Sequence, residues 1–284
     1  MPTSAQHQLV DLHAHSTASD GSRRPADVVA AARAAGLSAI ALTDHDTLGG
    51  LDEAAQAAAQ HGVRLIPGIE LSAVERDAET HILGLHLSDR ADLERRLVAL
   101  QDMRVTRARR MVERLNVLGI PVTMDSVLRE AQGGAVGRPH VARALIAGGW
   151  VTDFREAFDR FLGNHRQAFV PKDQLPVAEA VAMIHRAGGI AILAHPGSQM
   201  TRERLAAFAA MGLDGVEVLH PSHSDADAQR IDALAGELDL VRSGGSDWHG
   251  ADEGARTLGA MRVPGHWLTE QEARVAALAS RRVA

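Results

Sequence analysis

The chain has 284 residues, of which 45% are apolar and 23% charged, and its formal net charge at pH 7 is −6. This acidic balance, with five phenylalanines, three tryptophans and no tyrosine, argues against a protein whose whole surface binds long nucleic acid, because such surfaces are basic and rich in stacking aromatics. Cysteine is absent, which excludes disulfides, thiolate zinc sites and cysteine nucleophiles, so any metal must be bound by histidine and carboxylate side chains.

Neither a membrane span nor a secretory signal is visible in the sequence. No run of eighteen uncharged apolar residues occurs, and the N-terminal stretch MPTSAQHQ lacks a basic segment followed by an apolar one. We therefore expect a cytoplasmic protein that does not associate with membranes.

The first ninety residues alternate between short apolar runs and alanine-rich stretches, the rhythm of βαβ units. Helices are predicted between these runs, one beginning at Pro25 and stopping at Gly36, the other over 51–62. The charged stretch VERDAE is interpreted as a turn before the last of these strands. The predicted strands cover residues 9–13, 39–43, 63–70 and 80–87.

The same rhythm resumes after residue 165. Helices are predicted at 176–187, 202–211 and 224–236, and strands at 189–195, 214–220 and 238–244. This alternation is typical of a parallel sheet covered by helices, either an open doubly wound sheet or a barrel of the TIM kind. No glycine-rich nucleotide loop follows any strand.

The middle of the chain has no convincing strand pattern and reads as several helices. We interpret residues 100–165 as a helical insertion that forms a cap over the substrate. The barrel domain then consists of residues 1–99 and 166–284.

Polar clusters follow five of the predicted strands. In a parallel α/β fold the carboxyl ends of the strands share one face, so side chains more than two hundred positions apart converge there. Imidazole and carboxylate groups in such a set predict a site for two or three divalent cations. His81 lies near the start of its strand, so it joins the set only if that strand is reversed. The clusters are His13 with His15, Asp44-His45-Asp46, Glu70, His195, and Asp247 with His249.

Each cluster taken alone has a plainer interpretation. His13 and His15 could form a polar strand edge, and TDHD could begin a helix, with Asp46 or Thr47 as the N-cap. Trp248 is expected to fill the core. The remaining histidines, which lack this placement, are expected to be surface or core residues: His7, His61, His86, His165, His185 and His266.

Four motifs occur in chain order: HAH at 13–15 with Asp20 behind it, DHD at 44–46, AHP at 194–196 and SDWH at 246–249. With them, the chain resembles the polymerase and histidinol phosphatase (PHP) family over its whole length. The resemblance implies a distorted (β/α)7 TIM-like barrel with a helical insertion and a centre of three divalent metal ions. Mn²⁺ is the expected metal, with Fe²⁺ and Zn²⁺ as alternatives, because nitrogen and oxygen ligands suit all three.

The resemblance also implies which residues bind each ion. Glu70 would bridge the first and second ions, and all nine ligands of the family are present. The sets are His13, His15, Glu70 and Asp247 for the first ion, Glu70, His81 and His195 for the second, and Asp20, His45 and His249 for the third.

Three divalent ions among three carboxylates and six neutral imidazoles would carry a net charge of about +3, which attracts phosphate even inside an acidic protein. The predicted reaction is phosphoester hydrolysis, with a metal-bound hydroxide as the attacking group. Asp20 and His195 are the candidate donors of a proton to the leaving alcohol.

The insertion should select the phosphoester. Arg104 and Arg107 lie three residues apart, so a helix presents both on one face, where they could bind a second phosphate. Arg138 and His140 flank a predicted helix start and could form an anion site with its free N–H groups. His223 could add a hydrogen bond. The plainer interpretation is that the arginines form a solvated helix face.

Within the PHP family, these features resemble the branch of 3′,5′-nucleoside bisphosphate phosphatases and ribonuclease AM-type exoribonucleases. That branch implies hydrolysis of the 3′-phosphate of pAp to give AMP and phosphate, and 5′-3′ cleavage of short 5′-phosphorylated RNA. The expected partner is therefore a nucleotide or short RNA, and no protein partner is indicated. The alternatives are a histidinol-phosphate phosphatase, which needs one phosphate pocket and an acidic group for the substrate amine, and a metal-stabilised binding module without activity.

Overall fold

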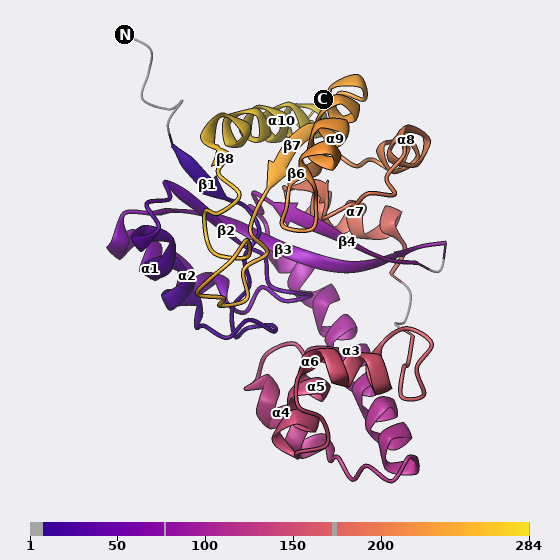
Figure 1. Ribbon diagram of the computed structural model, residues 1–284. Coiled ribbons are helices and arrows are strands. Elements are labelled where there is room, and N and C mark those ends of the chain that lie inside the picture. The colour runs from indigo at the N-terminus through magenta and orange to yellow at the C-terminus, as the bar shows by residue number, and fades with distance from the viewer. Residues whose placement is uncertain (1–7, 77, 172–174, 284) are drawn as a thin grey trace.

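The strands form one curved sheet in the computed structural model, which describes residues 8–76, 78–171 and 175–283 (Figure 1). The sheet order is β7-β6-β5-β4-β3-β2-β1-β8. β4 is antiparallel to both of its neighbours and β8 is antiparallel to β1, while the other neighbouring strands are parallel. The strands are β1 (Leu9–Asp11), β2 (Ala39–Leu42), β3 (Arg64–Glu75), β4 (Ala78–Leu85), β5 (Ile190–Leu193), β6 (Gly215–Leu219), β7 (Val241–Gly244) and β8 (Val263–Pro264).

The sheet nearly closes into a barrel where the segment after β1 meets β7. The Leu12 backbone N–H donates to the Gly244 carbonyl at 3.1 Å, and Ala14 forms a parallel bridge with Trp248. The α/β barrel predicted from the sequence is therefore confirmed. The reversed strand that His81 requires is β4.

Helices cover the outer face of the barrel and bury apolar side chains against it. The core contains, for example, Val28 and Val29 from the first helix and Ala54 from the second. Trp248 is also part of this core, as expected. The helices of the barrel part are α1 (Pro25–Ala34), α2 (Leu51–His61), α7 (Val177–Arg186), α8 (Arg202–Ala210), α9 (Asp225–Glu237) and α10 (Gly265–Val283).

A group of helices between β4 and β5 lies to one side of the barrel (Figure 1). These helices surround a second apolar cluster that begins at Ala108 and ends at Val170. The first of them, α3, belongs to both cores, since Leu93 and Leu97 pack in the barrel and Met111 packs in the second cluster. The elements are α3 (Ala91–Val117), α4 (Met124–Ala131), α5 (Arg138–Ala147), α6 (Phe154–Ala157) and the π-helical turn η2 (Phe158–Leu162).

Three details differ from the sequence-based expectation. β3 continues five residues beyond Glu70, because its second half pairs with β4 through to Glu75 and Ala78, so most of the predicted VERDAE turn is strand. β7 begins at Val241 rather than 238, because Leu238 and Asp239 form a turn after α9 ends at Glu237. The C-terminal β8 and α10 have no counterpart among the predicted elements.

His7 lies outside the described residues. Within the part of the chain that is described, no helix is both long and apolar enough to cross a membrane.

Candidate metal centre

The nine predicted ligands gather at one end of the barrel, and β1 and β2 position the first of them. His13 and His15 follow β1 with one residue between them, so both rings point to the same side, with their Nε2 atoms 3.1 Å apart. After β2 the chain continues beside β3, where His45 forms a parallel bridge with Glu70. The strand-end placement read from the sequence is thus what brings these rings together.

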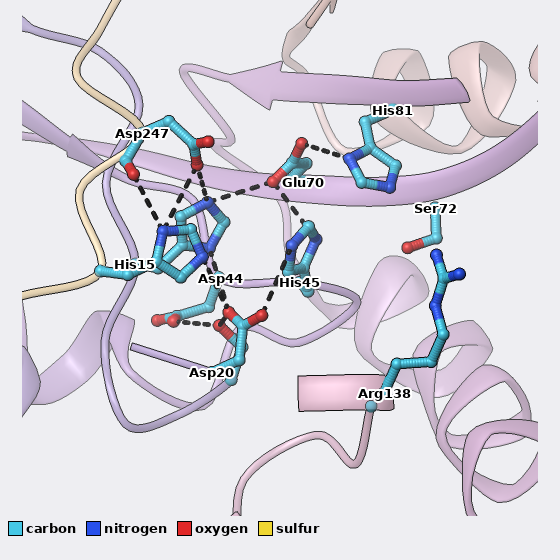
Figure 2. Close-up of polar contacts among 12 residues, drawn as sticks. His15, Asp20, Asp44, His45, Glu70, Ser72, His81, Arg138 and Asp247 are labelled. Atoms are coloured by element: carbon cyan, nitrogen blue, oxygen red, sulfur yellow. Dashed lines mark hydrogen bonds and ion pairs between the residues drawn. The ribbon is translucent and has the colours of Figure 1, made fainter. Parts of the chain in front are cut away.

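Glu70 lies at the middle of the cluster and is 1% exposed (Figure 2). Its Oε2 is 3.1 Å from Nε2 of both His13 and His15, and 3.2 Å from Nδ1 of His45. Its other oxygen, Oε1, lies 2.8 Å from Nδ1 of His81 and 3.1 Å from Nε2 of His195. One carboxylate therefore faces two groups of imidazoles, as a bridging ligand would.

The spatial groups among the described residues overlap with the sets implied by the family resemblance but differ from them in two ways. His45 rather than His195 joins Glu70 and His81, and His13, Glu217 and His220 form an additional group. His13, His15, Glu70 and Asp247 bring one ligand atom each within 4.8 Å of one another, and so do His45, Glu70 and His81. A further group of this kind contains His15, Asp20, His45 and His249.

Asp20 and His249 close the cluster on the side of the third set. Asp20 lies 3.2 Å from His249 and 3.9 Å from His45, measured between carboxylate oxygens and Nε2 atoms. Asp20 is held there through Asp44, which accepts hydrogen bonds of 2.7 Å from the Ser16 backbone N–H and from the hydroxyls of Ser16 and Ser19. Asp44 thus orders the loop that carries Asp20, a role that sequence reasoning did not assign to it.

The charges of the cluster are strongly coupled. Burial alone would raise the pKa of Glu70, but the imidazoles of His45, His13 and His81 outweigh it and hold that pKa well below its usual range. Burial alone would lower the pKa of His15, yet hydrogen bonds to Asp247 and Glu70 raise it to about 10. Desolvation dominates at His45 and lowers its pKa to about 3. Protons and divalent cations compete for such groups, so ion binding here must release protons.

The donor set fits divalent cations. Among the described residues, Nδ1 of His15 is buried without a hydrogen-bond partner, and Nδ1 of His45 faces Glu70 without forming a hydrogen bond to it. A buried polar atom without a partner is costly unless a ligand satisfies it. Imidazole and carboxylate ligands without thiolates suit Mn²⁺, Fe²⁺ and Zn²⁺.

A second row of polar side chains, from β6 and the loop after it, lies behind the cluster. Glu217 is fully buried and lies 3.0 Å from Nδ1 of His13. His220 is 3% exposed, and its Nε2 lies 3.5 Å from Asp247. Sequence reasoning missed both residues, although a charged residue inside the apolar strand GVEVL was a signal that could have found Glu217.

Comparison with known proteins gives the family. The PHP domain family matches residues 11–105. A 5′-3′ exoribonuclease from Haemophilus influenzae is 38% identical over 84% of this chain and 89% of its own length. A 3′,5′-nucleoside bisphosphate phosphatase from Chromobacterium violaceum is 39% identical over 88% of this chain and 90% of its own length. The chain belongs to the PHP family.

The solved structures agree with this assignment. A candidate metal-dependent phosphoesterase from Bifidobacterium adolescentis matches this PHP chain with a TM-score of 0.85 and 33% identity, over 96% of this chain and 98% of that one. The chain is therefore a member of a metal-dependent phosphoesterase family and has several clusters of histidine and carboxylate that are able to bind metal.

The predicted arginines of this PHP chain line a hollow of about 170 Å³ beside the cluster. Arg104, Arg107 and Arg138 share its wall with Asp20 and His45, so Arg104 and Arg107 do face the same way. Arg138 extends toward the centre from the start of α5 (Figure 2).

The arginines are already engaged by the protein. Arg104 donates to Asp46 at 2.6 Å, to the Ser72 hydroxyl at 3.0 Å and to the Val136 carbonyl at 3.1 Å. Arg107 donates to the Val170 carbonyl at 2.8 Å. Arg138 donates to Glu79 at 3.0 Å and to Asn164 at 3.2 Å. Their guanidinium groups are thus fixed in place at the wall of the hollow.

The structure gives His140 and His223 intramolecular hydrogen bonds instead. Nδ1 of His140 accepts from the Gly137 N–H at 2.9 Å and so caps the start of α5. The His223 ring accepts from the Gly197 N–H at 3.2 Å and donates to the Val218 carbonyl at 2.9 Å. Neither ring belongs to the lining of the arginine hollow. Their predicted contact with substrate stays a prediction.

Proposed function

We propose that this PHP protein hydrolyses the 3′-phosphate of 3′,5′-nucleoside bisphosphates, converting pAp to AMP and phosphate, and that it also removes 5′ nucleotides from short 5′-phosphorylated RNA. The observation that carries the proposal is the arginine hollow beside the histidine and carboxylate cluster. A substrate with two phosphate groups matches a site with two places for anions. Relatives named for both activities cover most of the chain.

We propose that three divalent ions, with Mn²⁺ as the expected metal, bind the nine residues in the sets given above. When bound, such ions stabilise charge on a phosphoryl group and lower the pKa of water toward neutrality. The side chains fix where that charge lies, with Glu70 between the first two sets and Asp20 in the third. The net charge of about +3 then favours a phosphate dianion.

The reaction joins a water oxygen to phosphorus and breaks the bond from phosphorus to the 3′-oxygen, which must take up a proton. His195 is the proposed donor. Burial alone would raise the pKa of Asp20, the other candidate, but His45 and His249 outweigh it and hold that pKa well below its usual range, so Asp20 is ionised. His195 is 27% exposed and lines a larger hollow of about 400 Å³, whereas Asp20 lines the arginine hollow.

We further propose that residues 100–165 form the cap of this site, with Arg104, Arg107 and Arg138 facing the 5′-phosphate. Guanidinium groups bind phosphate with paired, charge-assisted hydrogen bonds. Arg138 is the most exposed of the three, and its partners Glu79 and Asn164 also line the larger hollow.

Phosphate or nucleotide release from pAp, histidinol phosphate and a 5′-phosphorylated RNA dimer, compared with Mn²⁺ under one set of conditions, tests the proposal. We expect turnover of pAp and of the RNA dimer to exceed that of histidinol phosphate by at least tenfold. Preference for histidinol phosphate, retained after Arg104→Glu and Arg138→Glu, would establish the one-phosphate alternative. Metal binding without turnover of any of the three would favour the inactive binding module.

A further inference from the structure

Glu217 contacts two of the predicted ligands, which belong to different ion sets. It lies on β6 and is fully buried. Its Oε1 is 3.0 Å from Nδ1 of His13, and its Oε2 accepts a 2.7 Å hydrogen bond from the backbone N–H of His195. Both carboxylate oxygens therefore form a contact. One contacts the ring nitrogen of His13 that lies away from Glu70, and the other contacts the backbone of His195.

The contact with His13 determines which ring nitrogen carries the proton. An ionised carboxylate accepts hydrogen bonds but cannot donate them, so Nδ1 must be the protonated nitrogen. The lone pair of the neutral ring is then on Nε2. That atom lies 3.1 Å from Glu70 and 3.4 Å from Asp247, so the lone pair faces the other predicted ligands of the first ion.

The hydrogen bond from the His195 backbone N–H stabilises an unusual backbone conformation at that residue. His195 has a φ of 31°, in the left-handed region that residues with a side chain seldom adopt. Such a conformation persists only where the surroundings hold it. The hydrogen bond to Glu217 is such a restraint, and the ring of His195 then reaches Oε1 of Glu70 at 3.1 Å.

Stability of the strand does not explain a carboxylate at this position. β6 is otherwise apolar over Gly215–Leu219, and burying an ionised group costs more than burying an apolar one of similar size. A carboxylate that orients the histidine of a metal site commonly strengthens binding of the metal.

We propose that Glu217 is a positioning residue that fixes the His13 ring and the His195 backbone together, and so supports the first two ion sets at the same time. The proposal rests on the metal centre of the proposed function. It predicts that one substitution in β6 weakens ion binding in both sets, although Glu217 is not among the nine predicted ligands.

The test is Glu217→Gln in the full chain, with Mn²⁺ as the probe. The amide oxygen can still accept from one donor, but the amide nitrogen cannot accept from the second. We expect the affinity for Mn²⁺, measured by calorimetry, to fall by about 10 to 100-fold, and the Mn²⁺ retained per chain after gel filtration to decrease. Glu217→Asp, which keeps the charge but shortens the side chain, should give an intermediate loss.

Asp214 provides a matched control close to Glu217. Its buried carboxylate accepts from the Ala191 backbone N–H at 2.8 Å and lies 2.7 Å from Nε2 of His185, so it makes the same two kinds of contact away from the centre. Asp214→Asn should lower the melting temperature but leave Mn²⁺ affinity unchanged.

The outcomes separate two failures. A wild-type chain that binds no divalent ion would overturn the proposed function. A wild-type chain that binds Mn²⁺ while Glu217→Gln and Glu217→Asp bind it equally well, or while Asp214→Asn weakens binding as much, would overturn the role of Glu217 alone. If Glu217→Gln does not fold, the comparison of Glu217→Asp with Asp214→Asn decides.

Discussion

The barrel end and the helical insertion build their parts of the site in opposite ways. The predicted ligands come from segments between His13 and His249, so the whole barrel must fold before they meet. The insertion is one continuous segment with its own apolar core from Ala108 to Val170. The centre is therefore fixed by the entire fold, whereas the insertion brings its arginines to the hollow on one locally packed unit, and the barrel supplies the opposite part of the wall. We expect changes at the centre to alter turnover and metal content, and changes in the insertion to alter substrate affinity.

The largest effect should come from His13→Ala or Asp247→Ala. Either change removes a predicted ligand of the first ion, and a lost ion removes several kcal/mol of transition-state stabilisation. We expect turnover of pAp to fall by about a thousandfold or more, with less Mn²⁺ bound per chain. Full turnover in either variant, measured as phosphate release, would contradict the assignment of the centre.

Removal of the metal should destabilise the barrel end while leaving the stability of the insertion unchanged. An ion that binds the folded chain at 100 times its dissociation constant stabilises it by about 2.7 kcal/mol. Chelation should abolish activity and lower the melting temperature. Hydrogen exchange should show protection lost near His15 and Asp247 but kept around Leu115 and Leu145, which lie in the second core. Equal loss in both places would mean that the regions do not differ in this way.

Buried His140 connects the stability of the insertion to pH. Burial lowers the pKa of its ring to about 4, whereas the unfolded chain has a histidine of pKa about 6.5. The unfolded state therefore binds more protons between these values, and the free energy of unfolding should fall by about 3 kcal/mol as the pH drops from 6.5 to 4.

His140→Gln checks this estimate, because glutamine can also accept from the Gly137 N–H but does not titrate. Denaturant unfolding at several pH values should show a shallower slope for this variant than for wild type. His61→Gln, at the exposed end of α2, controls for loss of a surface histidine. Identical slopes for wild type and His140→Gln would rule out the proposed link.

The smallest expected effect is on substrate affinity. Arg138→Ala should raise KM for pAp by about tenfold while kcat changes little, because a charge-assisted hydrogen bond contributes about 1.5–3 kcal/mol. Arg109→Ala, on the exposed side of α3, is the matched control and should leave KM unchanged. A drop in kcat without a change in KM would place Arg138 in the chemistry instead.

The sequence allowed the strand-end ligands to be predicted because that argument needs only strand order and parallel packing. His81 did not follow from it, because parallel packing would place this residue at the other end of the sheet. It was assigned through the family resemblance, and the reversed strand that it requires is β4. Glu70 was predicted on the expectation that its strand ends there, although β3 continues to Glu75.

Other parts of the site depend on partners that no local pattern encodes. The hydrogen bond between Glu217 and His13 joins residues 204 positions apart. Likewise, the spacing of Arg104 and Arg107 predicts a shared face but not their bonds to Asp46 and the Val170 carbonyl. Periodicity reports which face is buried, whereas these contacts are set by tertiary packing.

The long helix α3 determines where this protein can be joined to the insertion of another family member. It spans 27 residues, or about 40 Å, and is rooted in the barrel through Leu93 and Leu97 while Met111 and Leu115 anchor the other end. A chimaera that carries the insertion of another family member should therefore be joined within α3, between Leu97 and Ala108. The loops at which domains are usually exchanged are the less suitable junctions. Joined there, the imported segment continues α3 in the same helical register and therefore keeps its rotation about the helix axis.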